Sequence, residues 1–159
     1  MFREMRRKKQ ALSHAENLEI LESRTAGVLA LCGDDDYPYA VPLSYLYCDS
    51  KIYFHGAMTG HKIDAIRKNE KASFCVIDKD TIVPEEYTSY FRSVIAFGKV
   101  HLVEDAAEKR AALTKLAAKY SPDHEQGRLA AIEKEMSHVC LIAFEVEALS
   151  GKAAIELFK

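Results

Sequence analysis

The chain has 159 residues, a net charge of −2, 48% hydrophobic residues and 29% charged residues. These values are ordinary for one soluble globular domain, which we expect to span residues 1–159. Because the net charge is close to zero, the protein as a whole is not expected to be attracted to nucleic acid or to an anionic membrane.

The first ten residues are strongly basic. A loose, solvated arm is one interpretation, because chain ends are often poorly ordered. An arm that folds over an anionic ligand is the other. A polar stretch at 10–22 follows instead of the apolar core of a signal peptide, and no run is long and apolar enough to span a bilayer. The cations are Arg3, Arg6, Arg7, Lys8 and Lys9.

The first half of the chain predicts a helix followed by a meander of strands. The sequence S-H-A-E at 13–16 is a capping box, which predicts a helix to about Ser23. Apolar runs and turn residues then predict further elements. These are strands at 27–32, 38–48 and 51–55, turns at 33–36 and 49–50, a loop at 56–60, and a helix at 61–68 with Ile63 and Ile66 facing inward.

The second half predicts three strands and two helices. Strands are expected at 72–77, 90–103 and 139–146, with a polar connection to about residue 88 and a bend or bulge at Gly98. Helices are expected from the cap at Asp105 to about 119 and at 129–136. About six strands that do not alternate with helices favour an antiparallel barrel with peripheral helices over a doubly wound sheet.

The four cysteines lie far apart, each in an apolar run, and form no C-x-x-C motif. This pattern predicts buried free thiols rather than disulfides or a zinc site. A reducing compartment, the cytoplasm, is therefore expected. The cysteines are Cys32, Cys48, Cys75 and Cys140.

The segment 38–45 is the first candidate for a binding site. Pro38 and Pro42 remove two backbone donors from an apolar strand, which is typical of an edge strand or of a strand that faces something else. The small residues Ala40 and Pro42 would let a flat ligand approach the backbone. An ordinary edge strand is the alternative. No G-x-G-x-x-G, P-loop or G-x-S-x-G motif competes with this segment.

The segment 54–62 is the second candidate. His61 and Lys62 stand in the first turn of a predicted helix, where cations are disfavoured unless an anion such as phosphate binds there. Gly56 and Gly60 would allow close backbone approach. Two tolerated surface charges are the alternative. A metal site built from His55 and His61 is disfavoured, because the spacing fits no common zinc pattern and no third ligand is near.

These runs, together with Tyr90-Phe91-Arg92-Ser93, resemble the FMN-binding split-barrel family that includes pyridoxamine 5′-phosphate oxidase. The likeness is greatest to its nitroimidazole-resistance (nitroimidazole reductase) branch and covers 2–152. It is carried by the order of MRRKKQ, GDDDYPYAVPLSYLY, KIYFHGAMTGHKIDAI, ASFCVI and YFRSVIAFGKVHLVED. The resemblance implies a mainly β, six-stranded antiparallel split barrel with peripheral helices, and a homodimer with FMN at the subunit interface.

The resemblance also implies which residues bind FMN. The strand at 40–44 would lie along the isoalloxazine, and His55, His61 and Lys62 would surround the ribityl-phosphate end. Ser93, with Tyr90 or Phe91, would reach in from the other subunit. Residues 90–93 by themselves are equally consistent with a barrel rim. The full expected set is Tyr39, Ala40, Val41, Pro42, Leu43, Ser44, His55, Gly56, Ala57, His61, Lys62, Tyr90, Phe91 and Ser93.

Three functional hypotheses follow. The first is an FMN-dependent oxidoreductase that reduces small electrophiles such as nitro-aromatic compounds. His55 is its candidate proton donor, because imidazole titrates near neutrality, although it could equally order the loop. Oxidation of vitamin B6 is disfavoured, since the chain lacks the C-terminal Trp and Arg-rich ending of the oxidase. The second is a non-catalytic FMN- or haem-binding sensor, and the third a cofactor-free dimerisation module.

Overall fold

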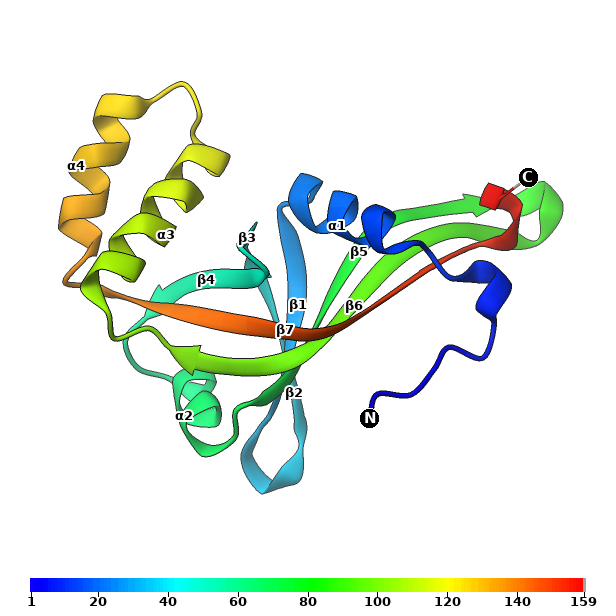
Figure 1. Ribbon diagram of the computed structural model, residues 1–159, viewed down its shortest axis with the longest axis horizontal. Helices are drawn as coiled ribbons and strands as arrows, with labels where there is room; N and C mark the ends of the chain where they lie inside the picture. The colour runs from blue at the N-terminus through cyan, green and yellow to red at the C-terminus, as the bar shows by residue number, and fades with distance from the viewer. Residues whose placement is uncertain (159) are drawn as a thin grey trace.

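An antiparallel sheet of seven strands, in the order β2-β1-β5-β6-β7-β4-β3, forms the centre of the computed structural model, which describes residues 1–158. The sheet curls into a barrel, with helices at its periphery (Figure 1). The strands are β1 (Ala26–Cys32), β2 (Pro38–Ser44), β3 (Leu46–Cys48), β4 (Lys51–Ala57), β5 (Lys71–Val83), β6 (Thr88–Leu102) and β7 (Val139–Ala153).

The expected count of six strands was wrong, because the segment 38–48 is two strands. Tyr45 alone joins β2 to β3, yet these strands form the two opposite edges of the sheet. The edges must therefore meet at Tyr45. The Tyr45 N–H donates to the hydroxyl of Tyr120 (2.9 Å), which also lies 2.8 Å from the Tyr45 carbonyl oxygen. At this residue the bonds to Tyr120 are added to one longer backbone bond, from the Tyr45 N–H to the Thr25 carbonyl (3.3 Å), just beyond the β1–β2 ladder.

Strands β5 and β6 extend beyond the barrel as a hairpin arm (Figure 1). Segment 78–83 was expected to be a polar connection, but residues 79–83 pair with residues 88–92. The expectation failed because both faces of the arm are open to solvent; Ile82, for example, is 66% exposed. Burial therefore does not impose the alternation of apolar and polar residues by which a strand is recognised in a sequence. Strand β7 follows β6 along the arm, seven residues past the expected end. The bulge predicted at Gly98 is confirmed by a register shift between Phe97 and Gly98.

The helices begin and end where local signals place them, with one exception. The capping box of α1 is present, since the Ser13 hydroxyl accepts from the Glu16 N–H and the Glu16 carboxylate accepts from the Ser13 N–H. The last helix starts four residues earlier than expected, because Gly127 weakens the helical signal there. The helices are α1 (His14–Ser23), α2 (His61–Lys68), α3 (Ala106–Tyr120) and α4 (Glu125–Glu135).

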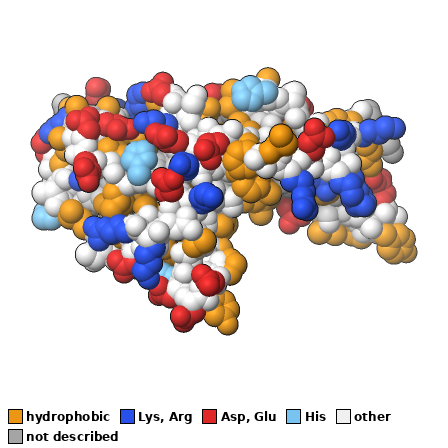
Figure 2. Space-filling model, turned by 60° about the horizontal axis from the view of Figure 1, so that its bottom comes forward, with side chains coloured by type: hydrophobic (Ala, Val, Ile, Leu, Met, Phe, Trp, Pro, Cys, Tyr) orange, Lys and Arg blue, Asp and Glu red, His pale blue; other side chains and the backbone are white. Residues whose placement is uncertain are grey.

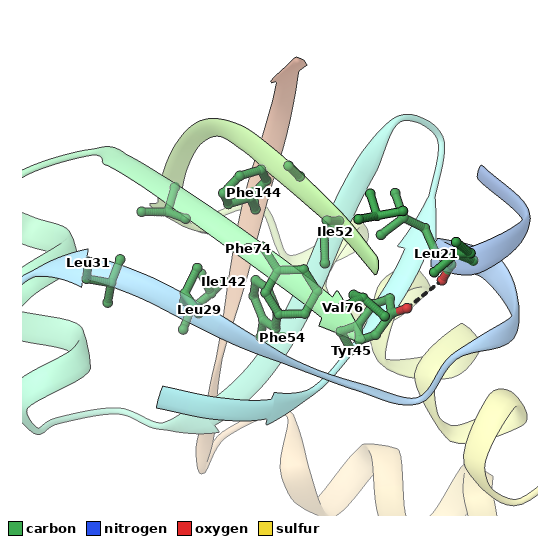
Figure 3. Packing of buried hydrophobic residues seen from close by; sticks show 14 of the residues in the cluster. Leu21, Leu29, Leu31, Tyr45, Ile52, Phe54, Phe74, Val76, Ile142 and Phe144 are labelled. Atoms are coloured by element: carbon green, nitrogen blue, oxygen red, sulfur yellow. Dashed lines mark hydrogen bonds between the residues drawn. The ribbon is translucent and has the colours of Figure 1, made fainter. Parts of the chain in front are cut away.

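The hydrophobic core has two parts. The larger fills the barrel, where the rings of Phe54 and Tyr45 each meet Phe74 edge-on at 5.0 Å between centroids (Figure 3). Ile63 and Ile66 of α2 are buried in it, as predicted. The smaller part lies between β3, β4 and β7 and the pair α3–α4. Strand β4 is therefore covered on both faces, and the α3–α4 pair shapes the surroundings of the exposed residues on its outer side.

The basic N-terminal segment lies against the protein itself. The Leu12 N–H donates to the Gly151 carbonyl (3.0 Å), and the ring of Phe2 contacts that of Phe97 at 5.5 Å between centroids. The segment thus starts against β6 at the outer-facing Phe97 and ends at β7, where Leu12 is buried in the barrel core. A wholly loose arm is not what the structure shows.

The prediction of buried cysteines was wrong. All four are unpaired, but Cys32 is exposed and the other three are partly exposed. Cys32 and Cys75 occupy outward-facing positions of β1 and β5, which the apolar runs around them did not reveal. Partial burial still raises the pKa of the Cys75 thiol above its ordinary value.

The Glu108 carboxylate connects α3 to β4 and makes stability depend on pH. Its Oε1 accepts from the Tyr53 hydroxyl (2.8 Å) and from Lys51 Nζ (3.1 Å), and these bonds lower the pKa of Glu108. A lowered carboxyl pKa stabilises the fold above about pH 4.3, the unfolded value, and this contribution disappears as pH falls through the folded pKa.

Glu108→Gln is therefore expected to lower the free energy of unfolding by about 1 kcal/mol at pH 7. The loss should shrink as pH falls below about 4. Urea unfolding at pH 7 and pH 3.5 measures both values. Glu104→Gln, which removes an exposed carboxylate just before α3, is the control and should change little. A loss for Glu108→Gln that is equal at both pH values would contradict the assignment.

Candidate functional site

Two predicted site residues from different strands, Ser44 and His55, converge on one pocket. His55 is exposed on the side of β4 that faces α3, because Phe54 and Gly56 take the alternate side. The pocket has a volume of about 460 Å³. It is lined by Ser44 and His55 and by residues from α3, α4 and the segment between them, namely Leu113, Leu116, Ala117, Tyr120, Ser121, His124, Gly127, Arg128, Ala131, Ile132 and Glu135.

The predicted residues around the start of α2 form a second group. The rings of Tyr39 and His61 stack with centroids 4.0 Å apart, and His61 Nε2 lies 3.8 Å from Asp34 Oδ2. Gly60, the N-cap of α2, has φ 126° and carries no side chain that could satisfy the first N–H groups of the helix. This backbone geometry requires glycine. The start of α2 is therefore an open site for hydrogen-bond acceptors.

Lys62 lies next to Gly56 at this helix end. A Cβ built on Gly56 would be 3.0 Å from Lys62 Nζ, so the absence of a side chain at Gly56 is what admits the ammonium group. Among residues 1–158, Lys62 forms no ion pair, whereas the nearby Lys68 pairs with Asp34 at 3.0 Å. Lys62 is thus a cation at the positive end of a helix dipole that no carboxylate pairs with directly, although Asp64 stands in the same first turn.

Strand β2 presents two different faces. It is an edge strand, as its prolines predicted. Ala40, Pro42 and Ser44 are exposed on its outer face, whereas Tyr39, Val41 and Leu43 pack against the barrel core. A ligand on the outer face would therefore contact the side chains of the first three residues, and only the main chain of Val41 and Leu43.

The third predicted group is remote from the other two within one chain. Tyr90, Phe91 and Ser93 lie on the arm, which projects away from α2 and from α3–α4 (Figure 1). The Tyr90 hydroxyl donates to Glu86 (2.7 Å), and Lys152 Nζ lies 5.3 Å from the centre of the Phe91 ring. These residues could join the other two groups only across a subunit boundary.

The outer side of the sheet between these groups is apolar and partly exposed, and Phe2 of the N-terminal segment lies against it at Phe97. Val28 is 36% exposed, Ile95 38% and Phe97 36%. The register places Val28 of β1, Cys75 of β5 and Ile95 of β6 side by side in one row. Figure 2 shows a notch between the body and the arm that hydrophobic side chains border. We call this surface, made by Val28, Cys75, Ile95 and Phe97, the outer sheet face.

Comparison with known proteins identifies the family of this chain. Residues 13–153 match the family model described as pyridoxamine 5′-phosphate oxidase. The chain belongs to this family. The match covers all seven strands, so the pyridoxamine 5′-phosphate oxidase-like fold, an antiparallel split barrel with peripheral helices, is that of the whole sheet described above.

Solved structures agree with the family assignment. An FAD-binding protein from Mesorhizobium loti is 27% identical, with a TM-score of 0.67 over 91% of this chain and 97% of that chain. Two further structures show the same fold. A putative 5-nitroimidazole antibiotic resistance protein from Bacteroides thetaiotaomicron has 21% identity and a TM-score of 0.75, covering 90% of this chain and 86% of that one. An FAD and heme binding protein from Mycobacterium smegmatis has 22% identity and a TM-score of 0.74, covering 92% and 73%.

Sequence reasoning missed the part of the site that α3 and α4 contribute. Tyr120, His124 and Arg128 line the pocket that contains His55. Nothing in their local sequence signals this, because they look like residues of peripheral helices until the fold places α3 and α4 over β4. No set of three or more His, Cys, Asp or Glu side chains in residues 1–158 is arranged to hold a metal ion. Within the same residues, no helix is long and apolar enough to cross a membrane.

Proposed function

We propose that this protein binds FMN and acts as a homodimeric reductase of small electrophiles such as nitro-aromatic compounds. The observation that carries the proposal is the open N-terminus of α2, with Lys62 beside Gly56 and no carboxylate paired with it. Membership of the pyridoxamine 5′-phosphate oxidase family supports it. We place the protein in the cytoplasm, in keeping with its four unpaired cysteines.

The residues present fit the chemistry of FMN. A phosphate would accept from the free N–H groups of α2 and from Lys62. The small outer residues of β2, Ala40 and Pro42, leave a flat surface against which an aromatic ring system could lie. Of the acidic residues nearby, Asp34 already holds Lys68 and lies close to His61, so its charge is largely balanced, and Asp64 in the first turn of α2 forms no ion pair with Lys62. The pKa of Asp34 is lowered, first by the hydrogen bond from Lys68.

When bound, FMN would supply the redox chemistry. The chain would position the cofactor and provide the proton. Lys62 and the start of α2 would hold the phosphate, and the outer face of β2 would orient the ring system. A ring nitrogen of His55, open to the pocket, would donate a proton to the reduced acceptor.

The proposal is tested first by the visible spectrum of the purified protein and by titration with FMN and FAD. Flavin-like absorbance, or tight binding of added FMN, is expected. A colourless protein that binds neither flavin would leave only a dimerisation module.

Steady consumption of a nitro-aromatic compound with a chemical or nicotinamide reductant is the second expectation. His55→Gln should slow this turnover at saturating FMN, where loss of a contact between His55 and the cofactor does not limit the rate. Flavin binding by the parent without any turnover would indicate a sensor or carrier.

A haem-binding module is the alternative that one comparison favours, since the Mycobacterium smegmatis structure is described as an FAD and heme binding protein. The same spectrum separates the two, because bound haem gives an intense absorption band that flavin lacks. Haem titration of the purified chain, monitored by that band, completes the test.

The homodimer is expected to form through the outer sheet face. An exposed apolar surface of this kind is typical of an interface, and a two-fold axis would bring Tyr90, Phe91 and Ser93 of one protomer toward the flavin site of its partner. Sedimentation should show a dimer at micromolar concentration. Ile95→Glu places a charge in the middle of this face and should weaken the dimer about a hundredfold or more.

Leu129→Glu is the control for the dimer prediction. Leu129 is also an exposed hydrophobic residue, at 58%, but it lies on α4, away from the outer sheet face. It should leave the dimer intact. A parent chain that stays monomeric, or equal behaviour of the two variants, would refute the proposed interface.

A further inference from the structure

The pocket between β4 and α3–α4 contains more chemistry than the proposed flavin site uses. Ser44 and His55 form one wall, and α3 and α4 form the others. We infer that this pocket binds the electron acceptor, and that the acceptor is an aromatic compound carrying a carboxylate. Its role as acceptor site rests on the proposed function; its ligand chemistry is argued from the pocket alone.

The walls suit a flat apolar body. Leu113, Leu116 and Ile132 are each less than 5% exposed, and they contribute to the pocket from two helices. Ala117, Gly127 and Ala131 have small side chains or none, which leaves the space between the helices open. A volume of about 460 Å³ lies within the range of small-molecule sites, roughly 300–1,000 Å³.

The positive charge of the pocket is concentrated at one end. Arg128 Nη1 donates to the carbonyls of Ser121 and Pro122, both at 2.6 Å, so the guanidinium is anchored by neutral groups. Its Nε and Nη2 donors, in a fork that matches a carboxylate, are used by no residue in the range 1–158. His124, also in the pocket, is the N-cap of α4 and makes no side-chain cap bond. The positive end of that helix adds to the field, although Glu125 in its first turn, outside the pocket lining, opposes it.

The acidic group of the pocket lies at the other end. Glu135 is seven residues after Arg128 on α4, which places it about 10 Å farther along the helix. A carboxylate would therefore be attracted to Arg128 and repelled from Glu135. This separation predicts a single orientation of an anionic ligand, with its acid group between His124 and Arg128 and its ring over the apolar helix faces.

The experiment compares two probes that differ only in charge, 6-nitro-2-naphthoate and 6-nitro-2-naphthamide. Calorimetric titration is done on the protein as purified and after saturation with FMN. The naphthoate is expected to bind at least tenfold more tightly than the amide. Arg128→Gln should reduce this preference to less than twofold. Arg110→Gln is the matched control, since it removes an arginine of α3 that pairs with Glu133 outside the pocket, and it should keep the preference.

A second pair of variants covers the case in which Arg128→Gln disturbs the fold. Ala131→Trp fills the pocket from an exposed position of α4, whereas Ala130→Trp adds the same bulk on a position that does not line it. The first should lose both probes and the second should retain them. Equal binding of the two probes to the parent, or unchanged binding to Ala131→Trp, would overturn the inference. Failure of FMN to bind while the naphthoate binds as expected would instead refute the proposed function alone.

Discussion

Lys62→Ala is expected to weaken FMN binding by about ten- to a hundredfold, because it removes one charge-assisted hydrogen bond worth roughly 1.5–3 kcal/mol. The bond would join the ammonium group to a phosphate at the open start of α2, where Gly60 supplies no cap. The free energy of unfolding of the flavin-free chain should stay the same or rise slightly. The reason is that the variant removes a cation from the positive end of a helix dipole.

The measurement is a fluorescence or calorimetric titration with FMN, beside urea unfolding of the flavin-free chain. Lys134→Ala, which removes an exposed lysine from the last turn of α4, is the charge-matched control and should bind FMN like the parent. A dissociation constant for Lys62→Ala within about twofold of the parent, roughly 0.4 kcal/mol, would show that the phosphate does not bind at the start of α2.

Gly98→Ala should destabilise the fold by about 3 kcal/mol or more, because a Cβ at this position would lie 1.9 Å from the Glu145 carbonyl oxygen. That contact is with the backbone of β7, which cannot move aside as a flexible side chain could. Gly98 also sits at the β-bulge between β6 and β7, within the barrel, where it is paired with Val146 of β7 and with Ala72 near the start of β5. The substitution would therefore force β6 and β7 apart within the barrel.

Urea unfolding monitored by far-UV circular dichroism gives the change in the free energy of unfolding. Gly127→Ala is the control, since nothing lies within 4 Å of a Cβ there and the residue is inside α4. It should stabilise the fold by about 0.5–1 kcal/mol, as alanine is the better helix former. If the two alanine variants unfold with similar free energies, the close approach of β6 to β7 at Gly98 is not real.

Local signals in the sequence predicted much of the fold. The capping box at Ser13 and Glu16, the helix at 61–68 and the bulge at Gly98 depend on residues within a few positions of one another. So does the turn at Asp49 and Ser50, where both residues have positive φ, as a two-residue hairpin turn requires. Each of these features is a property of short-range backbone geometry, which neighbouring residues decide.

The tertiary structure decided where those elements meet. Tyr45 separates two strands, and the hydroxyl of Tyr120, 75 residues later, bonds to both its N–H and its carbonyl. Segment 78–83 is a strand because it pairs with β6 in an arm that lies outside the barrel. Cys32 is exposed and the other three cysteines are only partly buried, because pairing of distant strands sets which face of the sheet they occupy.

The candidate site divides in the same way. The sequence by itself marked the cations and glycines of segment 54–62 and the prolines of β2, since residue type and order in a short run suffice to suggest an anion site and an edge strand. Only the fold brought Ser44 to His55 and set Arg128 and His124 over the same pocket. The physical reason is that such contacts join residues far apart in the chain, and strand register and helix packing, rather than local propensity, determine which of them meet.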